Sequence, residues 1–148
     1  SQFVERRQSF LTTAAAIGTI AQPFISAAQT AMKFEFTLSK VGAIANATGP
    51  ELSLLTQTAR SLGEQTKFTA TQSAEAMSYL GMAGWKTKEI VAGMPGLLNL
   101  AAAGNTDLAR TADIVSDNLT AFGLSADKAQ HMADVYAVTI TSTKSSFF

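Results

Sequence analysis

Residues 106–125, with the sequence TDLARTADIVSDNLTAFGLS, contain all the signals of one amphipathic helix and decide the fold class. Asn105 or Thr106 is expected to cap this helix, and Asp107 suits the positive end of the helix dipole. Gly123 stands where a left-handed residue commonly ends a helix. The apolar side chains recur at spacings of four and three, at Leu108, Ala112, Val115, Leu119 and Phe122. This period predicts a helix that buries one face.

A last helix is expected directly downstream of this one. Ser125 is expected to cap it, and Asp127 lies in its first turn. Its inward side carries Ala129, Met132, Tyr136 and Ile140. Residues 135–143 are rich in β-branched side chains, which lose rotamer freedom in a helix, so we expect the helix to fray there.

Two helices upstream have well-defined start signals. Thr48, which precedes Gly49-Pro50-Glu51, offers a capping hydroxyl, and a proline and an acid follow it in the first turn. Thr69 and Gln72 have the spacing of a capping box, in which each side chain bonds the backbone N–H of the other residue. We therefore expect one helix to begin after Thr48 and another after Thr69.

The segment between these helices and residue 106 contains weaker signals. Trp85 is expected to anchor packing or a hinge, and Thr87 to cap a short helix. Pro95 is expected to start or kink a further helical run, which stops at Gly104. No Asn-Gly or Asp-Gly pair joins two alternating runs, so no β-hairpin is expected. The sequence predicts an all-α fold with a compact array of about five shorter helices after a long N-terminal one.

The N-terminal helix is predicted from a stripe of apolar or small residues that repeats for five heptads. The stripe consists of Phe10, Thr13, Ile17, Ile20, Phe24, Ala27, Ala31, Phe34, Leu38, Val41 and Ala45. Such a stripe is typical of a helix that packs along a partner helix, as in a coiled coil. Pro23 lies inside it, so we expect a kink or a break between Thr19 and Pro23. We expect three regions: a heptad-like helical segment over residues 1–45, a helical domain over residues 46–143 and a tail over residues 144–148.

The composition excludes several classes of protein. Eleven basic and 11 acidic residues give a net charge of zero, which argues against a nucleic-acid-binding protein, and sequence-specific binding to nucleic acid is not expected. The absence of cysteine excludes a disulfide scaffold and a thiolate zinc site. Alanine accounts for 26 of the 148 residues, and alanine, threonine, serine and glycine together for 67, which favours close contact between helices. A chain that starts at Ser1 without methionine is expected to be a piece of a longer protein.

No group of side chains has the pattern of a catalytic, cofactor-binding or metal-binding site. His131 is the only histidine, and Asp127 and Asp134 share roughly one helix face with it. Asp113 and Asp117 lie one turn apart. We interpret both groups as parts of solvated helix faces, and we expect no enzymatic activity, no cofactor and no metal ion.

The N-terminal segment leaves an alternative open. No charged residue lies between Arg7 and Lys33, a distance long enough to span a bilayer. Arg6-Arg7 followed by an apolar region also resembles a twin-arginine export signal. One hypothesis is therefore a non-catalytic helical interaction module that is exported, or active on membranes, through residues 7–33.

The runs FEFTLSKV at 34–41, LTQTARSLG at 55–63, TKFTATQSAEAM at 66–77, MAGWKTKEI at 82–90 and MPGLLNLAAAG at 94–104 form a specific pattern. Shorter runs continue it at 106–109, 114–117, 121–126 and 132–135. Over residues 34 to about 138, the chain resembles the phage tail tape measure proteins, in particular the helical region of the minor-tail group. The agreement weakens after Val138.

This resemblance implies a structural role in the tail of a phage or prophage. In this family the tail tube polymerises around a long helical chain, whose length sets the length of the tail. The resemblance implies a place in the tube lumen of the virion, and in the host bacterial cytoplasm during assembly. The implied partners are tail tube proteins, tail assembly chaperones, baseplate or tail-tip proteins and further copies of the chain. It also implies a role in DNA ejection, with membrane contact at that stage.

Overall fold

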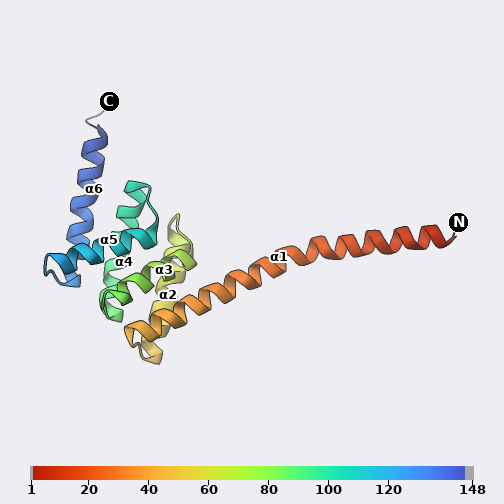
Figure 1. Ribbon diagram of the computed structural model, residues 1–148, viewed down its shortest axis with the longest axis horizontal. Helices are drawn as coiled ribbons and strands as arrows, with labels where there is room; N and C mark the ends of the chain where they lie inside the picture. Colours follow the sequence, from red (N-terminus) through yellow and green to blue (C-terminus); the bar gives the residue numbers. More distant parts are fainter. Residues whose placement is uncertain (1, 146–148) are drawn as a thin grey trace. The chain divides into compact units, whose positions relative to one another are not determined.

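The computed structural model describes the backbone of residues 2–145 and the side chains of residues 22–143. Across these residues the fold is all-α, with six α-helices, one 3-10 turn and no strand (Figure 1). The elements are α1 (Gln2–Ala45), α2 (Gly49–Gln65), α3 (Ala70–Met82), α4 (Thr87–Gly104), α5 (Leu108–Ala121), η1 (Ala126–Lys128) and α6 (Ala129–Ser145). The predicted order, one long helix and then five shorter ones, is confirmed.

The chain divides into two compact units, Ser1–Lys33 and Phe34–Phe148. The first unit contains most of α1, and its described side chains are all exposed. The second contains the end of α1 together with α2 to α6, and it holds the hydrophobic core. The sequence-based division into residues 1–45, 46–143 and 144–148 stays a prediction.

Helix α1 is continuous across Pro23, so of the kink or break expected between Thr19 and Pro23, the break is absent and the kink stays a prediction. A proline removes one helical hydrogen bond and its ring crowds the carbonyl four residues earlier, but the hydrogen bonds on either side of that position remain. Pro23 is exposed, so its ring meets solvent rather than a neighbouring helix. The helix therefore tolerates this proline without an interruption.

The predicted stripe on α1 has two different environments. Its last four members, Phe34, Leu38, Val41 and Ala45, are buried in the core of the second unit. Phe24, Ala27 and Ala31 are exposed, and 72% of the Phe24 surface is accessible. The side chains of the four earlier members, Phe10, Thr13, Ile17 and Ile20, lie outside the described residues.

The two predicted helix starts at Thr48 and Thr69 are confirmed as capping boxes. The Thr48 N–H donates to Glu51 Oε2 at 2.8 Å, and the Glu51 N–H donates to Thr48 Oγ1 at 3.4 Å. The Thr69 N–H donates to Gln72 Oε1 at 2.8 Å, and the Gln72 N–H donates to Thr69 Oγ1 at 3.1 Å. These bonds satisfy backbone N–H groups that a helix start leaves without a partner inside the helix.

Helix α4 differs from the prediction at both its start and its middle. Lys86 occupies the cap position, whereas Thr87 is the first helical residue and is buried. The Lys86 N–H donates to Glu89 Oε2 at 2.7 Å, so the acid three residues later stabilises this start. The helix continues through Pro95 instead of starting there. It ends at Asn105, whose φ of 49° is left-handed.

The start of α5 differs from the prediction, whereas its end agrees with the prediction. Asp107, and not Asn105 or Thr106 as expected, is the N-cap, because its carboxylate accepts the Arg110 N–H at 2.9 Å. Gly123 has a φ of 64°, which confirms it as the left-handed terminator. Phe122 is not part of the buried face: 71% of it is exposed, because it lies at the C-cap, where the helix ends.

The start of α6 is preceded by the short turn η1. Ser125 holds the cap position of η1, and its hydroxyl donates to the carboxylate of Asp127. The helix proper begins at Ala129 and runs to Ser145. The fraying expected over residues 135–143 is therefore absent from α6.

Small residues allow the helices of the second unit to lie close together. Helix α3 packs against α2 and α5, and α4 packs mainly against α6. A Cβ placed on Gly63 would lie 2.5 Å from the backbone nitrogen of Ala70. On Gly96 it would lie 2.6 Å from Gln130 Oε1, across the contact between α4 and α6. These positions explain part of the small-residue excess in the composition, since a larger side chain would force the elements apart.

Candidate functional site

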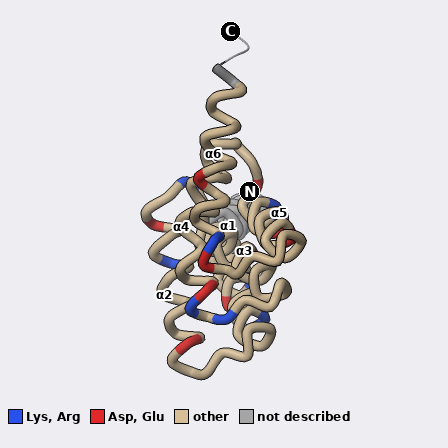
Figure 2. The backbone as a smooth tube through the Cα atoms, turned by 90° about the vertical axis from the view of Figure 1, so that its left-hand side faces the viewer, with Lys and Arg blue, Asp and Glu red and all other residues tan. Residues whose placement is uncertain are grey.

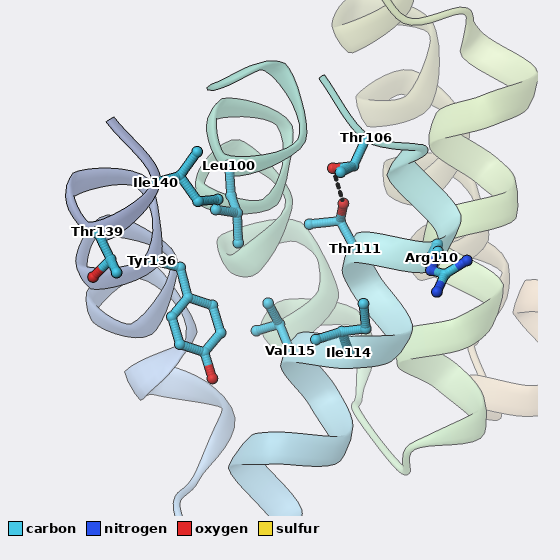
Figure 3. Close-up of a pocket in the computed structure, with 9 residues that line it drawn as sticks. All are labelled: Leu100, Thr106, Arg110, Thr111, Ile114, Val115, Tyr136, Thr139 and Ile140. Atoms are coloured by element: carbon cyan, nitrogen blue, oxygen red, sulfur yellow. Dashed lines mark hydrogen bonds between the residues drawn. The ribbon is translucent and has the colours of Figure 1, made fainter. Parts of the chain in front are cut away.

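An apolar groove opens between α4, α5 and α6 (Figure 3). It encloses about 220 Å³. Its lining residues are Leu100, Thr106, Arg110, Thr111, Ile114, Val115, Tyr136, Thr139 and Ile140. Figure 3 shows Leu100 from α4, Val115 from α5 and the Tyr136 ring from α6 arranged around one open space.

The groove remains open because α6 packs mainly against α4 and less closely against α5. Tyr136 is half-buried, and its ring extends from α6 toward Val115 and Ile114 on α5 (Figure 3). Ile140, one turn later, extends toward Leu100 on α4. Side chains of all three helices thus line the groove.

The polar groups at one end of the groove are paired with one another. The Thr111 hydroxyl donates to the backbone carbonyl of Asp107 at 2.8 Å. Thr106 Oγ1 and Thr111 Oγ1 lie 2.9 Å apart, so Thr106 is the donor in that pair. The lining is therefore apolar except for these paired hydroxyls and the charged side chain of Arg110.

A second, more polar hollow adjoins the groove and shares Arg110 and Ile114 of α5 with it. It encloses about 370 Å³ between α3 and α5 and is lined by Tyr79, Asp107, Ala109, Arg110, Asp113 and Ile114. Asp113, singled out in the sequence together with Asp117, lines this hollow and is exposed. Asp117 is also exposed and lines neither hollow, so the structure does not bring the two carboxylates to a common site.

The acidic residues near His131 have separate partners. Asp127 lies in η1, where its Oδ2 is 3.1 Å from Lys128 Nζ. The hydrogen bond from Ser125, followed by that from Lys128, lowers the pKa of Asp127. Asp134 Oδ1 accepts from Gln130 Nε2 at 2.8 Å. Within the described residues, no three histidine or acidic side chains converge as metal ligands would.

Trp85 is a packing anchor, as expected. It is buried, and its indole lies against Gly93 of α4. Phe34 also has a specific neighbour, because the Arg60 guanidinium lies 5.5 Å above the centre of its ring. Phe68 is a core residue that the periodicity did not reveal, because it precedes α3 and belongs to no helical stripe.

Charged residues are sparse along the backbone (Figure 2). In α6, residues 135–143 form one uncharged stretch. No helix in the described part of the chain has the length and apolar character that crossing a bilayer requires.

Comparisons with known proteins place this region in a family. Residues 56–147 match the model of a family described as phage-related minor tail protein. The chain is 42% identical over 105 residues to a tape measure protein of Pneumococcus phage Dp-1, a match that covers 71% of this chain and 9% of the relative. It is 33% identical over 97 residues to a probable tape measure protein of Escherichia phage P2, covering 66% of this chain and 12% of the relative.

The matched region spans only about a tenth of the length of these two relatives. No solved structure matches the chain. The family match covers more than half of the sequence and includes α3, α4 and α5 completely. The groove and the Trp85–Gly93 contact therefore lie within the family's own region, and the chain belongs to the phage-related minor tail protein family, as the sequence motifs predicted.

Proposed function

We propose that this chain is a segment of a tape measure protein, a structural component of a phage tail that takes part in tail assembly and sets tail length. The observation that carries the proposal is the 42% identity over 105 residues to a protein named as a tape measure protein. We assign no catalytic role to any residue.

The helical architecture suits a ruler. A helix converts residue number into distance at about 1.5 Å per residue, so the 44 residues of α1 correspond to about 66 Å. The compact second unit contributes less length per residue. We therefore assign the measuring role within this segment to α1.

The surroundings proposed for this segment are the lumen of the tail tube in the virion and the host cytoplasm during assembly. Its proposed partners are tail tube proteins, assembly chaperones, baseplate or tail-tip proteins and further copies of the chain. The exposed apolar residues Phe24, Ile25 and Met32 on α1 support a helical partner along that segment. The balanced charge supports a chain that leaves the tube during DNA ejection without adhering to its wall.

A length change in the phage gene tests the proposal directly. Duplicating residues 10–44 adds five heptads, keeps the phase of the stripe, and is expected to lengthen the tail by about 50 Å at the helical rise. Tail length is measured by electron microscopy, and the control is a variant in which the same number of codons is changed without altering the length. An unchanged tail length in the duplication variant would contradict the measuring role.

The alternative is a helical interaction module that is exported or acts on membranes through residues 7–33. It is favoured by the absence of charge between Arg7 and Lys33 and by the exposed Phe24 and Ile25. It predicts processing near Ala27-Ala28 or leakage of lipid vesicles caused by the full chain. Under this alternative, exchange of Ile17 and Ile20 for aspartate would abolish the leakage. Leakage that is absent from the unmodified chain, or that is unchanged in this variant, would contradict the alternative.

A further inference from the structure

Arg110 joins the apolar groove to the polar hollow and has no ionic partner of its own. Its side chain lines both the groove and the hollow between α3 and α5. Among the residues that the structure describes, no carboxylate forms an ion pair with its guanidinium. Figure 3 shows this guanidinium on the far side of α5 from Tyr136. Arg110 therefore places a positive charge that is available to a ligand where the groove meets the hollow.

The polar hollow carries charges of both signs along one face of α5. Asp107, Arg110 and Asp113 follow one another at intervals of three residues, which makes them neighbours on a helix surface. Asp107 is engaged at the helix start, where its Oδ1 accepts the Arg110 N–H at 2.9 Å. Asp113 is exposed and lines the hollow together with Tyr79 of α3. A ligand head with only one sign of charge would meet a like charge here, so the hollow favours a head that carries both signs.

The groove and the hollow together form an elongated site with a fixed order of chemical groups. The groove, of about 220 Å³, offers apolar side chains such as Val115 and Ile140. Arg110 follows at the junction, and the hollow of about 370 Å³ continues with Asp113 and Tyr79. Small-ligand sites typically have about 300–1,000 Å³ and a mainly apolar lining with a few polar groups that fix orientation. A complementary ligand has an apolar chain first, then an anion, then a cation.

We propose that this composite site binds one lysophosphatidylethanolamine, a single-chain phospholipid with a zwitterionic head. Its acyl chain lies in the groove, and its phosphate accepts paired hydrogen bonds from the Arg110 guanidinium. Its ammonium lies against the Asp113 carboxylate and the Tyr79 ring. In this lipid the phosphate lies nearer the chain than the ammonium does, which is the order of the site. A free apolar amino acid lacks this order, because its carboxylate and its ammonium are attached to the same carbon.

The proposal concerns a ligand of the second unit, so its outcome is separate from that of the tail-length experiment. The first test is calorimetric titration of the full chain with lysophosphatidylethanolamine below the concentration at which the lipid forms micelles. We expect one lipid to bind per chain. Arg110→Gln is expected to raise the dissociation constant about tenfold or more, because hydrogen bonds between charged groups are lost. Asp113→Asn is expected to raise it about two- to fivefold, as loss of an exposed ion pair does.

Asp117→Asn is the matched control for these variants. Asp117 is exposed on α5, as Asp113 is, but it lines neither hollow. The dissociation constant of this variant is expected to equal that of the unmodified chain. Circular dichroism verifies that all three variants keep their helices.

The second test exchanges the head of the lipid. Lysophosphatidylglycerol has the phosphate but no ammonium, so we expect it to bind more weakly to the unmodified chain. Asp113→Asn should bind this lipid more tightly than the unmodified chain does, because the substitution removes a repelling charge. The same substitution thus has opposite effects on the two lipids, which a general loss of packing would not produce.

Four results would overturn the proposal. The first is a titration without binding of one lysophosphatidylethanolamine per chain, including binding that appears only with micelles. The second is equal affinity for the two lipids, and the third is one dissociation constant shared by Arg110→Gln and Asp117→Asn. The fourth is equally tight binding of phosphoethanolamine without an acyl chain, since the groove would then have no part in recognition.

Discussion

The indole of Trp85 covers Gly93 so closely that a Cβ on residue 93 would lie 2.6 Å from the ring carbon Cζ3. Trp85 is buried, and it precedes the helix that contains Gly93. The indole and the bare backbone therefore form one unit, in which the absence of a side chain makes room for the largest aromatic ring of the protein.

Gly93→Ala is expected to destabilise the fold by about 1–3 kcal/mol, because the added methyl group displaces a buried ring in a packed core. Trp85 is the only tryptophan, so its fluorescence reports both the displacement and the unfolding transition in urea. Gly49→Ala is the control, since a Cβ on Gly49 meets nothing within 4 Å. Equal urea midpoints for the two variants would show that the indole moves aside without cost.

Thr48→Ala is expected to lower the free energy of unfolding by about 0.5–2 kcal/mol, the usual cost of losing a helix cap. The variant leaves the Glu51 N–H without the oxygen that accepts it at 3.4 Å. Thr48→Ser, which keeps the hydroxyl, is the matched control and should retain most of the stability. Thermal unfolding followed by circular dichroism distinguishes the two variants.

Acid is expected to weaken the same helix start through Glu51. The backbone N–H of Thr48, and then its hydroxyl, hold the pKa of Glu51 below its usual value. Because the folded pKa is depressed, this stabilisation is present above the unfolded pKa and is lost as the pH falls through the folded pKa. Glu51→Gln should therefore flatten the decline of stability in that acidic window. Parallel curves of unfolding free energy against pH for the two proteins would contradict this role of the carboxylate.

Two of the left-handed helix ends, at Asn105 and Gly123, are expected to respond in opposite directions to substitution. Gly123→Ala places a Cβ at a φ of 64° and should destabilise the chain by about 1–2 kcal/mol. Asn105→Gly relieves a non-glycine residue at a φ of 49° and should stabilise it by a few tenths to about 1 kcal/mol. Urea unfolding gives the free energy of unfolding of each variant. A change of the same sign in both variants would refute the explanation by backbone conformation.

The starts of α2 and α3 were predictable because their signals are local. The partners in the boxes at Thr48 and Thr69 lie three residues away, so the sequence alone brings them together. The sequence left open whether Pro23 and Pro95 kink or interrupt their helices, because a proline removes one hydrogen bond while the bonds on either side of it remain. Both Pro23 and Pro95 are exposed inside continuous helices.

The groove was not predictable from the sequence. It depends on how far α5 and α6 diverge while both pack against α4, a relation between residues that are distant in the chain. The periodicity places Val115 and Tyr136 on inward faces without indicating that a space remains between them. Phe122 was misplaced for a simpler reason, since the stripe continued by one step beyond the point where Gly123 turns the chain.

The presence of Pro95 inside α4 has a consequence for how that helix opens. The ring removes the N–H that would have bonded the carbonyl of Val91, so the middle of the helix lacks one of its internal links. Amide hydrogen exchange usually begins where a helix frays, at its two ends. In α4 we expect a third starting point at its centre, so the amides on either side of Pro95 would exchange as two separate groups.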